Sequence, residues 1–283
     1  SLDKLVAYQT LFPVVDQLET AGIKCVQSIS QWKFNLAIIS IPKSKKLARH
    51  LIYLATKAVP EGLIIVDGNK SNGIESIIRD LEKKIKITNV VSKAHGKTAW
   101  FETPVDLEIY KDIPIKIEDG FETQAGVFSS DGVDPASELL IQLLPRDLKG
   151  VGADLGGGWG YLSANVLKTN SIRELHFIEA DFTAINLAKN NLNDKRVKFY
   201  WCDALKWNAP ELLDFIIMNP PFHHLGRAIP ALGVDFIKVA SRNLKKSGTL
   251  WIVANRHLPY EDAIHRHFSS FSELPGSKKF KVI

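Results

Sequence analysis

Cysteine is scarce in this chain, which has only two among its 283 residues. Cys25 and Cys202 lie far apart, and neither has a His or Cys neighbour at the spacing of metal ligands. A structural zinc site needs about four ligands, and a disulfide framework needs several cysteines. We therefore expect two buried thiols, with neither a metal site nor a disulfide framework.

Long apolar runs are missing as well. No run approaches the roughly 18 to 20 residues that a membrane-spanning helix requires, and the first residues lack the basic, apolar and small-residue order of a signal peptide. The composition, 45% hydrophobic and 24% charged, is typical of a globular protein with one large or two ordinary domains. We expect a soluble, cytoplasmic protein with no membrane partner.

Acidic residues are outnumbered by basic ones. The chain has 36 Lys and Arg against 31 Asp and Glu, which gives a net charge of +5 and a pI near 9.0. A basic balance favours a polyanionic partner such as nucleic acid. Alone it excludes little, since many basic proteins bind no nucleic acid.

The first half alternates strand-like and helix-like segments but has no glycine-rich loop. The pattern predicts a helix within 2–22, strands at 23–29 and 34–41, a helix at 45–59, a strand at 63–67, a helix at 73–85, and strands at 87–93 and 98–103. This βαβα order argues for a parallel sheet, and the nearly continuous apolar run at 34–41 for a strand covered on both faces. We expect a scaffold or substrate-docking domain over 1–112 and a second domain over 113–283.

A glycine-rich loop over residues 120–134 follows, punctuated by Phe121 and Phe128. A loop of this length inside a compact domain is more often functional than idle. Asp134 is a suitable N-cap for the next helix, and Pro135 suits its first position.

A second glycine cluster comes after the strand expected at 150–155. The segment reads Asp154-Leu155-Gly156-Gly157-Gly158-Trp159-Gly160. A dinucleotide-binding fingerprint would place a third glycine where Tyr161 stands. Glycines at 156, 158 and 160 after Asp154 fit instead the loop that holds the amino acid end of S-adenosylmethionine, because glycine lets the backbone turn sharply and leaves room for a ligand.

Carboxylates end the next two expected strands. Glu179 follows the strand at 174–178, where it can accept hydrogen bonds from two ribose hydroxyls. Asp203, followed by Ala204, ends the strand at 197–201, where a carboxylate can accept from the adenine amine. Asp181 is expected to cap the next helix.

The strand at 213–218 leads into Asn219-Pro220-Pro221-Phe222. Two prolines make a rigid turn, but chemistry accounts for all four residues. An exocyclic amine is a poor nucleophile because its lone pair is delocalised into the ring. If the Asn219 side-chain carbonyl and the Pro220 backbone carbonyl accept its hydrogens, the lone pair is directed at the methyl donor. Phe222 would stack on the base, a contact of about 1 to 3 kcal/mol in single-strand binders.

This scheme requires no general base and no metal. His223 and His224 are given no catalytic role, and Arg227 could contact a phosphate.

With these motifs the chain resembles the bacterial ribosomal small-subunit RNA guanine-N2 methyltransferases and their large-subunit relatives. The resemblance covers residues 120–283 well and the first half only by its pattern of elements. The matching residues are Phe121-Glu122-Thr123, Gly126-Val127-Phe128-Ser129, Asp131-Gly132-Val133-Asp134, the Asp154–Gly160 loop, Asn219-Pro220-Pro221-Phe222-His223, Ile252-Val253-Ala254-Asn255 and Leu258-Pro259-Tyr260.

The resemblance implies an α/β fold of tandem Rossmann-like methyltransferase domains. The C-terminal domain would be a class I seven-stranded sheet with an antiparallel terminal hairpin, and the N-terminal domain a degenerate copy that binds no cofactor. S-adenosylmethionine would be surrounded by Asp154, Gly156, Gly158, Glu179 and Asp203, with Phe128 over it and Asn219 to Phe222 holding the guanine. We also expect Gly160, Ala204 and Asn219 to border the cofactor. The chain departs from the family at Trp159, where a small residue is usual, and at 224–227.

Other functions remain open. The same turn serves adenine-N6 and cytosine-N4 DNA methyltransferases and glutamine-N5 protein methyltransferases, and a catalytically inactive RNA-binding assembly factor could retain the fold. The partner expected from the resemblance is ribosomal RNA or the 30S subunit, bound by a monomer. The residues expected to dock RNA are Lys43, Lys45, Lys46, Arg49, Lys83, Lys84 and Lys86.

Overall fold

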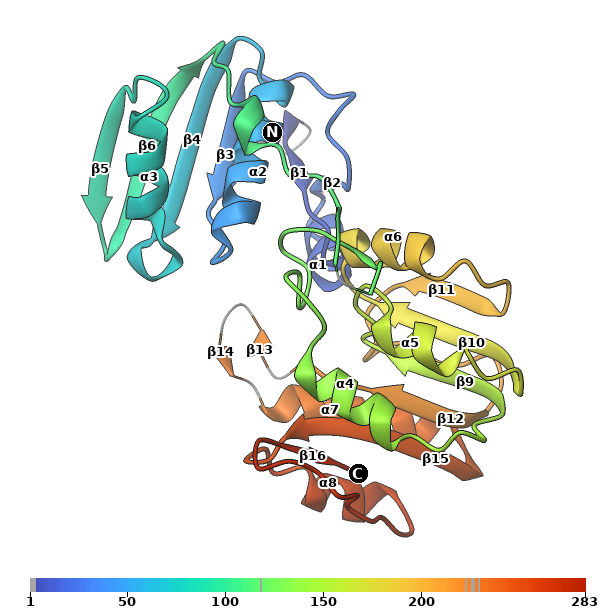
Figure 1. Ribbon diagram of the computed structural model, residues 1–283. Coiled ribbons are helices and arrows are strands. Elements are labelled where there is room, and N and C mark those ends of the chain that lie inside the picture. The colour runs from blue at the N-terminus through green and yellow to red at the C-terminus, as the bar shows by residue number, and fades with distance from the viewer. Residues whose placement is uncertain (1–3, 118, 222, 225–226, 229) are drawn as a thin grey trace.

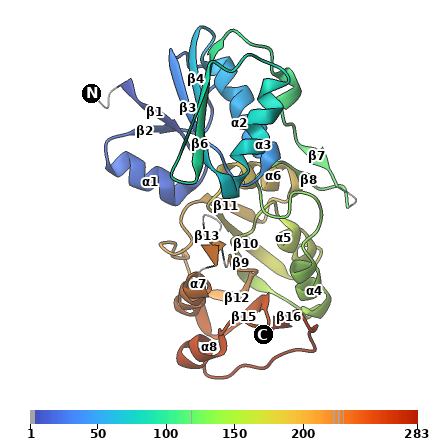
Figure 2. The same ribbon diagram turned by 90° about the vertical axis from the view of Figure 1, so that its left-hand side faces the viewer.

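The computed structural model describes residues 4–117, 119–221, 223–224, 227–228 and 230–283, and only the backbone of those between 223 and 230. Its elements form two lobes, one built on a four-stranded sheet and the other on a six-stranded sheet (Figure 1). We call residues 34–110 the first lobe and residues 120–283 the second lobe. Figure 2 shows the first lobe above the second, with helix α1 (Phe12–Thr20) at the level of their junction.

The sheet of the first lobe has the order β3-β4-β6-β5. Only β3 and β4 are parallel, while β6 runs antiparallel to both of its neighbours. The prediction of a parallel sheet is therefore right for one pair and wrong for the others. The elements of this lobe are β3 (Leu36–Ser40), α2 (Lys45–Ala58), β4 (Gly62–Asn69), η2 (Lys70–Asn72), α3 (Ile74–Glu82), β5 (Asn89–Lys93), β6 (Gly96–Thr103) and η3 (Glu108–Tyr110).

A tight turn explains the antiparallel pair β5–β6. The two strands are joined by Ala94 and His95 alone, and both have positive φ, 49° and 59°. Two residues with positive φ are typical of the hairpin turn that matches the twist of the strands. The usual Asn-Gly signal for such a turn is absent from this sequence.

Both helices of the first lobe pack on the same face of its sheet. Ile39, Ile64 and Phe101 point into the core that α2 and α3 cover. The side chain of Ile38 lies on the opposite face and is 68% exposed. The strand expected to be covered on both faces is thus open on one, because β3 is an edge strand and no described helix packs on that side.

The first expected helix begins later than its pattern indicated. Residues 6–8 form the short strand β1 (Val6–Tyr8), which pairs in parallel with β2 (Lys24–Val26). Helix α1 starts only at Phe12, with Pro13 in its first turn. Proline favours a helix start because its missing N–H has no partner there in any case.

The second lobe has the strand order β11-β10-β9-β12-β15-β16, in which only β16 is antiparallel to its neighbour. The expected α/β sheet is confirmed, with six strands where seven were predicted. In place of the seventh strand, Leu274 forms a single bridge with Val282. The strands are β9 (Gly150–Leu155), β10 (Ile172–Glu179), β11 (Val197–Trp201), β12 (Leu213–Met218), β15 (Leu244–Asn255) and β16 (Phe280–Val282).

Helices cover both faces of this sheet (Figure 1). Because β9, β10, β11 and β12 are parallel, their carboxyl ends meet at one edge, which is where such sheets bind ligands. The remaining elements are β7 (Ile115–Lys116), β8 (Glu122–Thr123), α4 (Pro135–Leu143), α5 (Tyr161–Val166), α6 (Phe182–Asn191), β13 (His223–His224), β14 (Arg227–Ala228), α7 (Pro230–Asn243) and α8 (Glu261–His267).

Candidate active site

The glycine loop turns from β9 into α5 at the carboxyl edge of the sheet. Gly156, Gly158 and Gly160 have φ of +78°, +59° and +101°, a region that side chains rarely adopt. The Gly156 N–H donates to the Ile178 carbonyl at 2.9 Å, which holds the loop against β10. A Cβ added at Gly158 would meet no atom within 4 Å, so the loop has open space at this point for a ligand.

Asp154, the last residue but one of β9, lies beneath this loop with no exposed surface. Its Oδ2 accepts a hydrogen bond from the Ser163 hydroxyl at 2.7 Å, whereas its Oδ1 has no partner among the described residues. Burial raises its pKa to about 7, the hydrogen bond from Ser163 lowers the pKa, and the nearby Glu179 charge raises it. A buried acceptor without a donor suits a cationic group such as the ammonium of the expected cofactor.

Glu179 ends β10 beside the same loop. Its Oε2 accepts from the Gly158 N–H at 2.8 Å and its Oε1 from the Asp181 N–H at 2.8 Å. Burial raises the pKa of this carboxyl, while these backbone bonds work in the opposite direction. Each carboxylate oxygen has capacity for a further hydrogen bond, so the arrangement can receive two vicinal hydroxyls.

Asp203 shapes the turn after β11. Its Oδ1 accepts from the Leu205 N–H at 2.9 Å, and its backbone carbonyl accepts from the Lys206 N–H at 3.0 Å. Ala204 is buried in the hydrophobic core beneath the turn. The carboxylate is thus held at the same edge of the sheet as Glu179, with one oxygen engaged locally.

The Asn219 side chain is oriented by two residues that the sequence did not connect with it. Its Nδ2 donates to Asp134 Oδ2 at 2.8 Å and to Ser137 Oγ at 2.9 Å. A carboxylate only accepts, so the amide nitrogen faces Asp134 and the carbonyl oxygen, Oδ1, faces away. Both amide hydrogens are therefore used inside the protein, and Oδ1 remains the acceptor for a ligand.

Asp134 has a second function, which the sequence did predict. It is the N-cap of α4, where its Oδ2 accepts from the Ser137 N–H at 2.9 Å, and Pro135 begins the helix. Asp134 and Asn219 are 85 positions apart. Capping chemistry was visible in the local sequence, but no local signal joins the cap to the Asn-Pro-Pro-Phe turn.

The rest of that turn is only partly described. Pro220 is buried and Pro221 is exposed. Phe222, predicted to stack on the base, lies outside the described residues. So do the side chains of His223, His224 and Arg227.

Trp159 anchors the glycine-rich loop that carries Phe128. The indole N–H of Trp159 donates to the Phe128 carbonyl at 3.0 Å, and its ring is 3% exposed. That ring packs against Phe121 and Tyr161, with centroids 5.2 Å and 5.8 Å away. The Phe128 side chain itself is 58% exposed. Trp159 therefore fastens this loop to the glycine cluster.

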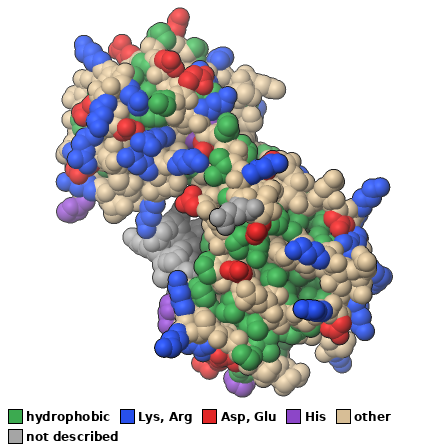
Figure 3. All heavy atoms as spheres, in the orientation of Figure 1, with side chains coloured by type: hydrophobic (Ala, Val, Ile, Leu, Met, Phe, Trp, Pro, Cys, Tyr) green, Lys and Arg blue, Asp and Glu red, His purple; other side chains and the backbone are tan. Residues whose placement is uncertain are grey.

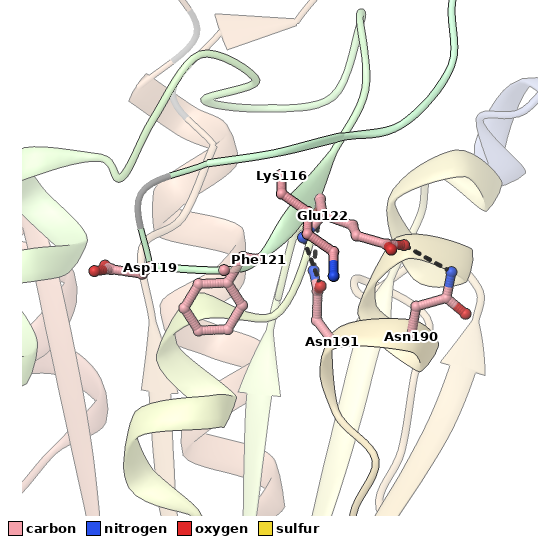
Figure 4. A pocket seen from close by; sticks show the side chains of 7 residues that line it. Lys116, Asp119, Phe121, Glu122, Asn190 and Asn191 are labelled. Atoms are coloured by element: carbon pink, nitrogen blue, oxygen red, sulfur yellow. Dashed lines mark hydrogen bonds between the residues drawn. The ribbon is translucent and has the colours of Figure 1, made fainter.

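A small polar pocket of about 250 Å³ is lined by Lys116 and residues 119–122, at the start of the same loop, and by Asn190 and Asn191 at the end of α6 (Figure 4). Asn191 links the two segments that line the pocket. Its Oδ1 accepts from the Glu122 N–H at 2.8 Å, and its Nδ2 donates to the Glu122 carbonyl at 3.0 Å. Asn190 donates to the Glu122 carboxylate at 3.1 Å. None of the residues predicted to bind cofactor or substrate lines this pocket, so it is separate from the candidate site.

Several basic residues of the first lobe already have acidic or polar partners. Arg49 forms an ion pair with Asp80 at 2.8 Å, and Lys46 pairs with Asp112 at 3.0 Å. Lys45 donates to a serine hydroxyl at 2.8 Å. Figure 3 shows Lys and Arg side chains spread over this lobe among acidic ones. Their part in docking RNA stays a prediction.

In the part of the chain that the structure describes, no helix is long and apolar enough to cross a membrane. No three of the described His, Cys, Asp and Glu side chains come together as a group able to hold a metal ion.

This chain is similar to known proteins in its sequence and in its fold. The family described as "Methyltransferase small domain" matches residues 118–283. A ribosomal RNA small subunit methyltransferase C from Shewanella loihica is 31% identical over 96% of this chain and 83% of its own. A ribosomal RNA large subunit methyltransferase G from Yersinia enterocolitica is 28% identical over 88% of this chain and 66% of its own.

A solved structure matches across both lobes. It is a Thermus thermophilus 16S rRNA N2 methyltransferase in complex with AdoMet and guanosine. The TM-score is 0.77 at 22% identity, and the match covers 96% of this chain and 79% of that one. The arrangement of the two lobes is therefore shared with that structure.

Proposed function

This chain belongs to the methyltransferase small domain family, and on that premise we propose that it methylates the exocyclic N2 amine of a guanine in small-subunit ribosomal RNA. The chain is an enzyme that uses S-adenosylmethionine. The small-subunit relatives support ribosomal RNA as its substrate, and the solved relative with guanosine supports guanine as its base.

The residues at the sheet edge fit this cofactor. Asp154 Oδ1 would accept from the ammonium group, and the open backbone at Gly158 would lie against the methionine part. Glu179 would accept the ribose hydroxyls, and Asp203 with Ala204 would border the adenine. When bound, S-adenosylmethionine supplies a methyl group on a positively charged sulfur. Gly156 and Gly160 shape the loop, and Phe128 would lie over the cofactor.

The amine would be held by two carbonyl oxygens, Asn219 Oδ1 and Pro220 O. Each accepts one N–H of the guanine amine, so the nitrogen lone pair points toward the methyl donor and charge developing on nitrogen is stabilised. Pro220 and Pro221 make the turn rigid. Phe222 would stack on the base, as its place in the motif predicts.

The observation that carries this proposal is the fixed direction of the Asn219 amide. Because Asp134 and Ser137 take both of its hydrogens, its oxygen is presented to the site before any substrate binds. Such preorganisation avoids rotation of the amide at the moment of reaction. The chemistry needs an acceptor at this position, which a reversed amide would not supply.

The test is transfer of labelled methyl from S-adenosylmethionine to ribosomal RNA and to assembled 30S subunits, followed by nucleoside analysis. Wild type should yield N2-methylguanosine, and Asn219→Ala should lose it while still binding cofactor. Label on adenine, cytosine or protein would assign the enzyme to another planar amine. Cofactor binding without label on any substrate would contradict the proposed substrate, and failure to bind cofactor would favour an inactive assembly factor.

The proposal extends to the partner and its binding. We expect a cytoplasmic monomer in which 1–112 is a degenerate methyltransferase-like domain that docks RNA and 113–283 is catalytic. If several of the first lobe's basic residues contact phosphates, log affinity should fall with log salt by about 0.7 to 0.9 for each contact. A flat salt dependence would contradict docking by these residues.

A further inference from the structure

Residues 9–16, which we call the N-terminal segment, pack directly on the second lobe. The Phe12 N–H donates to the Ala180 carbonyl at 2.8 Å, and the Phe182 N–H donates to the Thr10 carbonyl at 2.8 Å. These two bonds run in opposite directions, as in an antiparallel pair. The N-terminal segment therefore acts as a short partner strand for the turn that follows β10.

One side chain joins both sides of this contact. The indole N–H of Trp201, the last residue of β11, lies 2.9 Å from the Ala180 carbonyl and 3.2 Å from the Thr10 carbonyl. Its ring meets Phe12 and Phe182 edge-on, with centroids 5.2 Å and 5.0 Å away. Trp201 thus links the N-terminal segment, the turn and the neighbouring strand.

The turn after β10, which the N-terminal segment contacts, directly follows Glu179. The Asp181 N–H donates to Glu179 Oε1 at 2.8 Å, and the Asp181 carboxylate accepts a hydrogen bond from the Thr10 side chain. Thr10 therefore contacts the residue that orients the Glu179 carboxylate. A small displacement of the turn would move both oxygens of that carboxylate.

The N-terminal segment also reaches the turn at Asp203. Asp16 pairs with Lys206 at 2.7 Å, and the Lys206 N–H donates to the Asp203 carbonyl at 3.0 Å. Both side chains of the ion pair are exposed, so its contribution to stability is small. It nevertheless shows that the N-terminal segment touches both turns assigned to the adenosine part of the cofactor.

We propose that the N-terminal segment is a positioning element of the cofactor site, which holds the Glu179 turn in the geometry that receives the ribose. The inference rests on the proposed role of Glu179. It assigns to residues of the predicted docking domain a function in binding S-adenosylmethionine. Thr10 and Trp201 act through Ala180 and Asp181 and do not themselves touch the cofactor.

The test uses the full chain with Trp201→Phe and, separately, Thr10→Val. The first removes the shared indole N–H and keeps an aromatic ring between Phe12 and Phe182, and the second removes the hydroxyl that bonds to Asp181. Calorimetry should show the Kd for S-adenosylmethionine rising by about three- to tenfold, the amount expected for one typical hydrogen bond lost. At saturating cofactor, kcat and the KM for RNA should stay within about twofold of wild type.

Trp251→Phe is the matched control, because the indole N–H of Trp251 has no partner among the described residues. Trp251 lies on β15, which is separated from β11 by three strands of the sheet. It should leave the Kd unchanged. A wild-type protein that does not bind S-adenosylmethionine would refute the cofactor assignment itself. Wild-type binding together with unchanged Kd in both variants would overturn this inference, even if the variants melt at lower temperature.

Discussion

Replacing Asp134 with Ala removes two functions that one oxygen atom performs. Asp134 Oδ2 accepts from the Ser137 N–H at 2.9 Å, which caps helix α4, and from Asn219 Nδ2 at 2.8 Å, which orients the Asn219 amide. The substitution removes both bonds. It should therefore lower both the stability of the protein and the rate of methyl transfer.

The two losses have different sizes. An N-cap contributes about 1 kcal/mol, and a loss of that size lowers the melting temperature of a domain of 150 to 250 residues by about 2 to 4 °C. The bond to Asn219 involves a carboxylate and is worth about 1.5 to 3 kcal/mol. Ser137 Oγ still accepts one amide hydrogen, so we expect the lower end of that range, a fall in kcat/KM of about tenfold to thirtyfold.

The assay is single-turnover methyl transfer to RNA at saturating S-adenosylmethionine, with the cofactor Kd and the melting temperature measured in parallel. Ser44→Ala is the matched control, because Ser44 caps α2 in the first lobe by accepting from the Leu47 N–H at 3.3 Å. It should lower stability but not the rate. Asp134→Asn keeps a neutral acceptor oxygen, so its rate should be intermediate. If Asp134→Ala transfers methyl as fast as Ser44→Ala, the orientation of Asn219 does not depend on Asp134.

Two further predictions concern the cofactor loop. The folded pKa of Asp154, about 7, lies above its unfolded value of about 3.9, so the folded state retains the proton through the window between them. The free energy of unfolding of the cofactor-free protein should therefore fall as pH rises across that window. Urea unfolding should show a weaker fall with pH for Asp154→Asn. The same dependence on pH in both proteins would refute this prediction. Trp159→Phe loses the N–H bond to the Phe128 carbonyl and should raise the Kd for S-adenosylmethionine by about three- to tenfold in calorimetry. An unchanged Kd would show that this anchor does not serve the cofactor.

Local spacing predicted the second lobe well. The strands expected at 150–155, 197–201 and 213–218 have those bounds in the structure. Each is a short apolar run that ends in residues with a strong turn preference, and such signals act over a few positions. Since parallel strands end at one edge of a sheet, their order alone brought the glycine loop, Glu179 and Asn219 to the same edge.

The first lobe was predicted less well. Its strands were found, but apolar runs do not show strand direction or which face a helix will cover. Ile38 belongs to an apolar run and is nevertheless exposed, because both helices pack on the other face. The Ala94–His95 turn reverses the chain without the residues that usually announce such a turn.

The amino-acid sequence by itself determined the elements of the second lobe, the glycine loop and the cap at Asp134, because each depends on residues close together in the chain. Only the tertiary structure decided that Asp134 meets Asn219 across 85 positions, and that the N-terminal segment pairs with the turn at Ala180 in the second lobe. The direction of a side-chain amide follows from the donors and acceptors that packing brings beside it. Those neighbours come from distant segments, and local periodicity and turn chemistry carry no information about them.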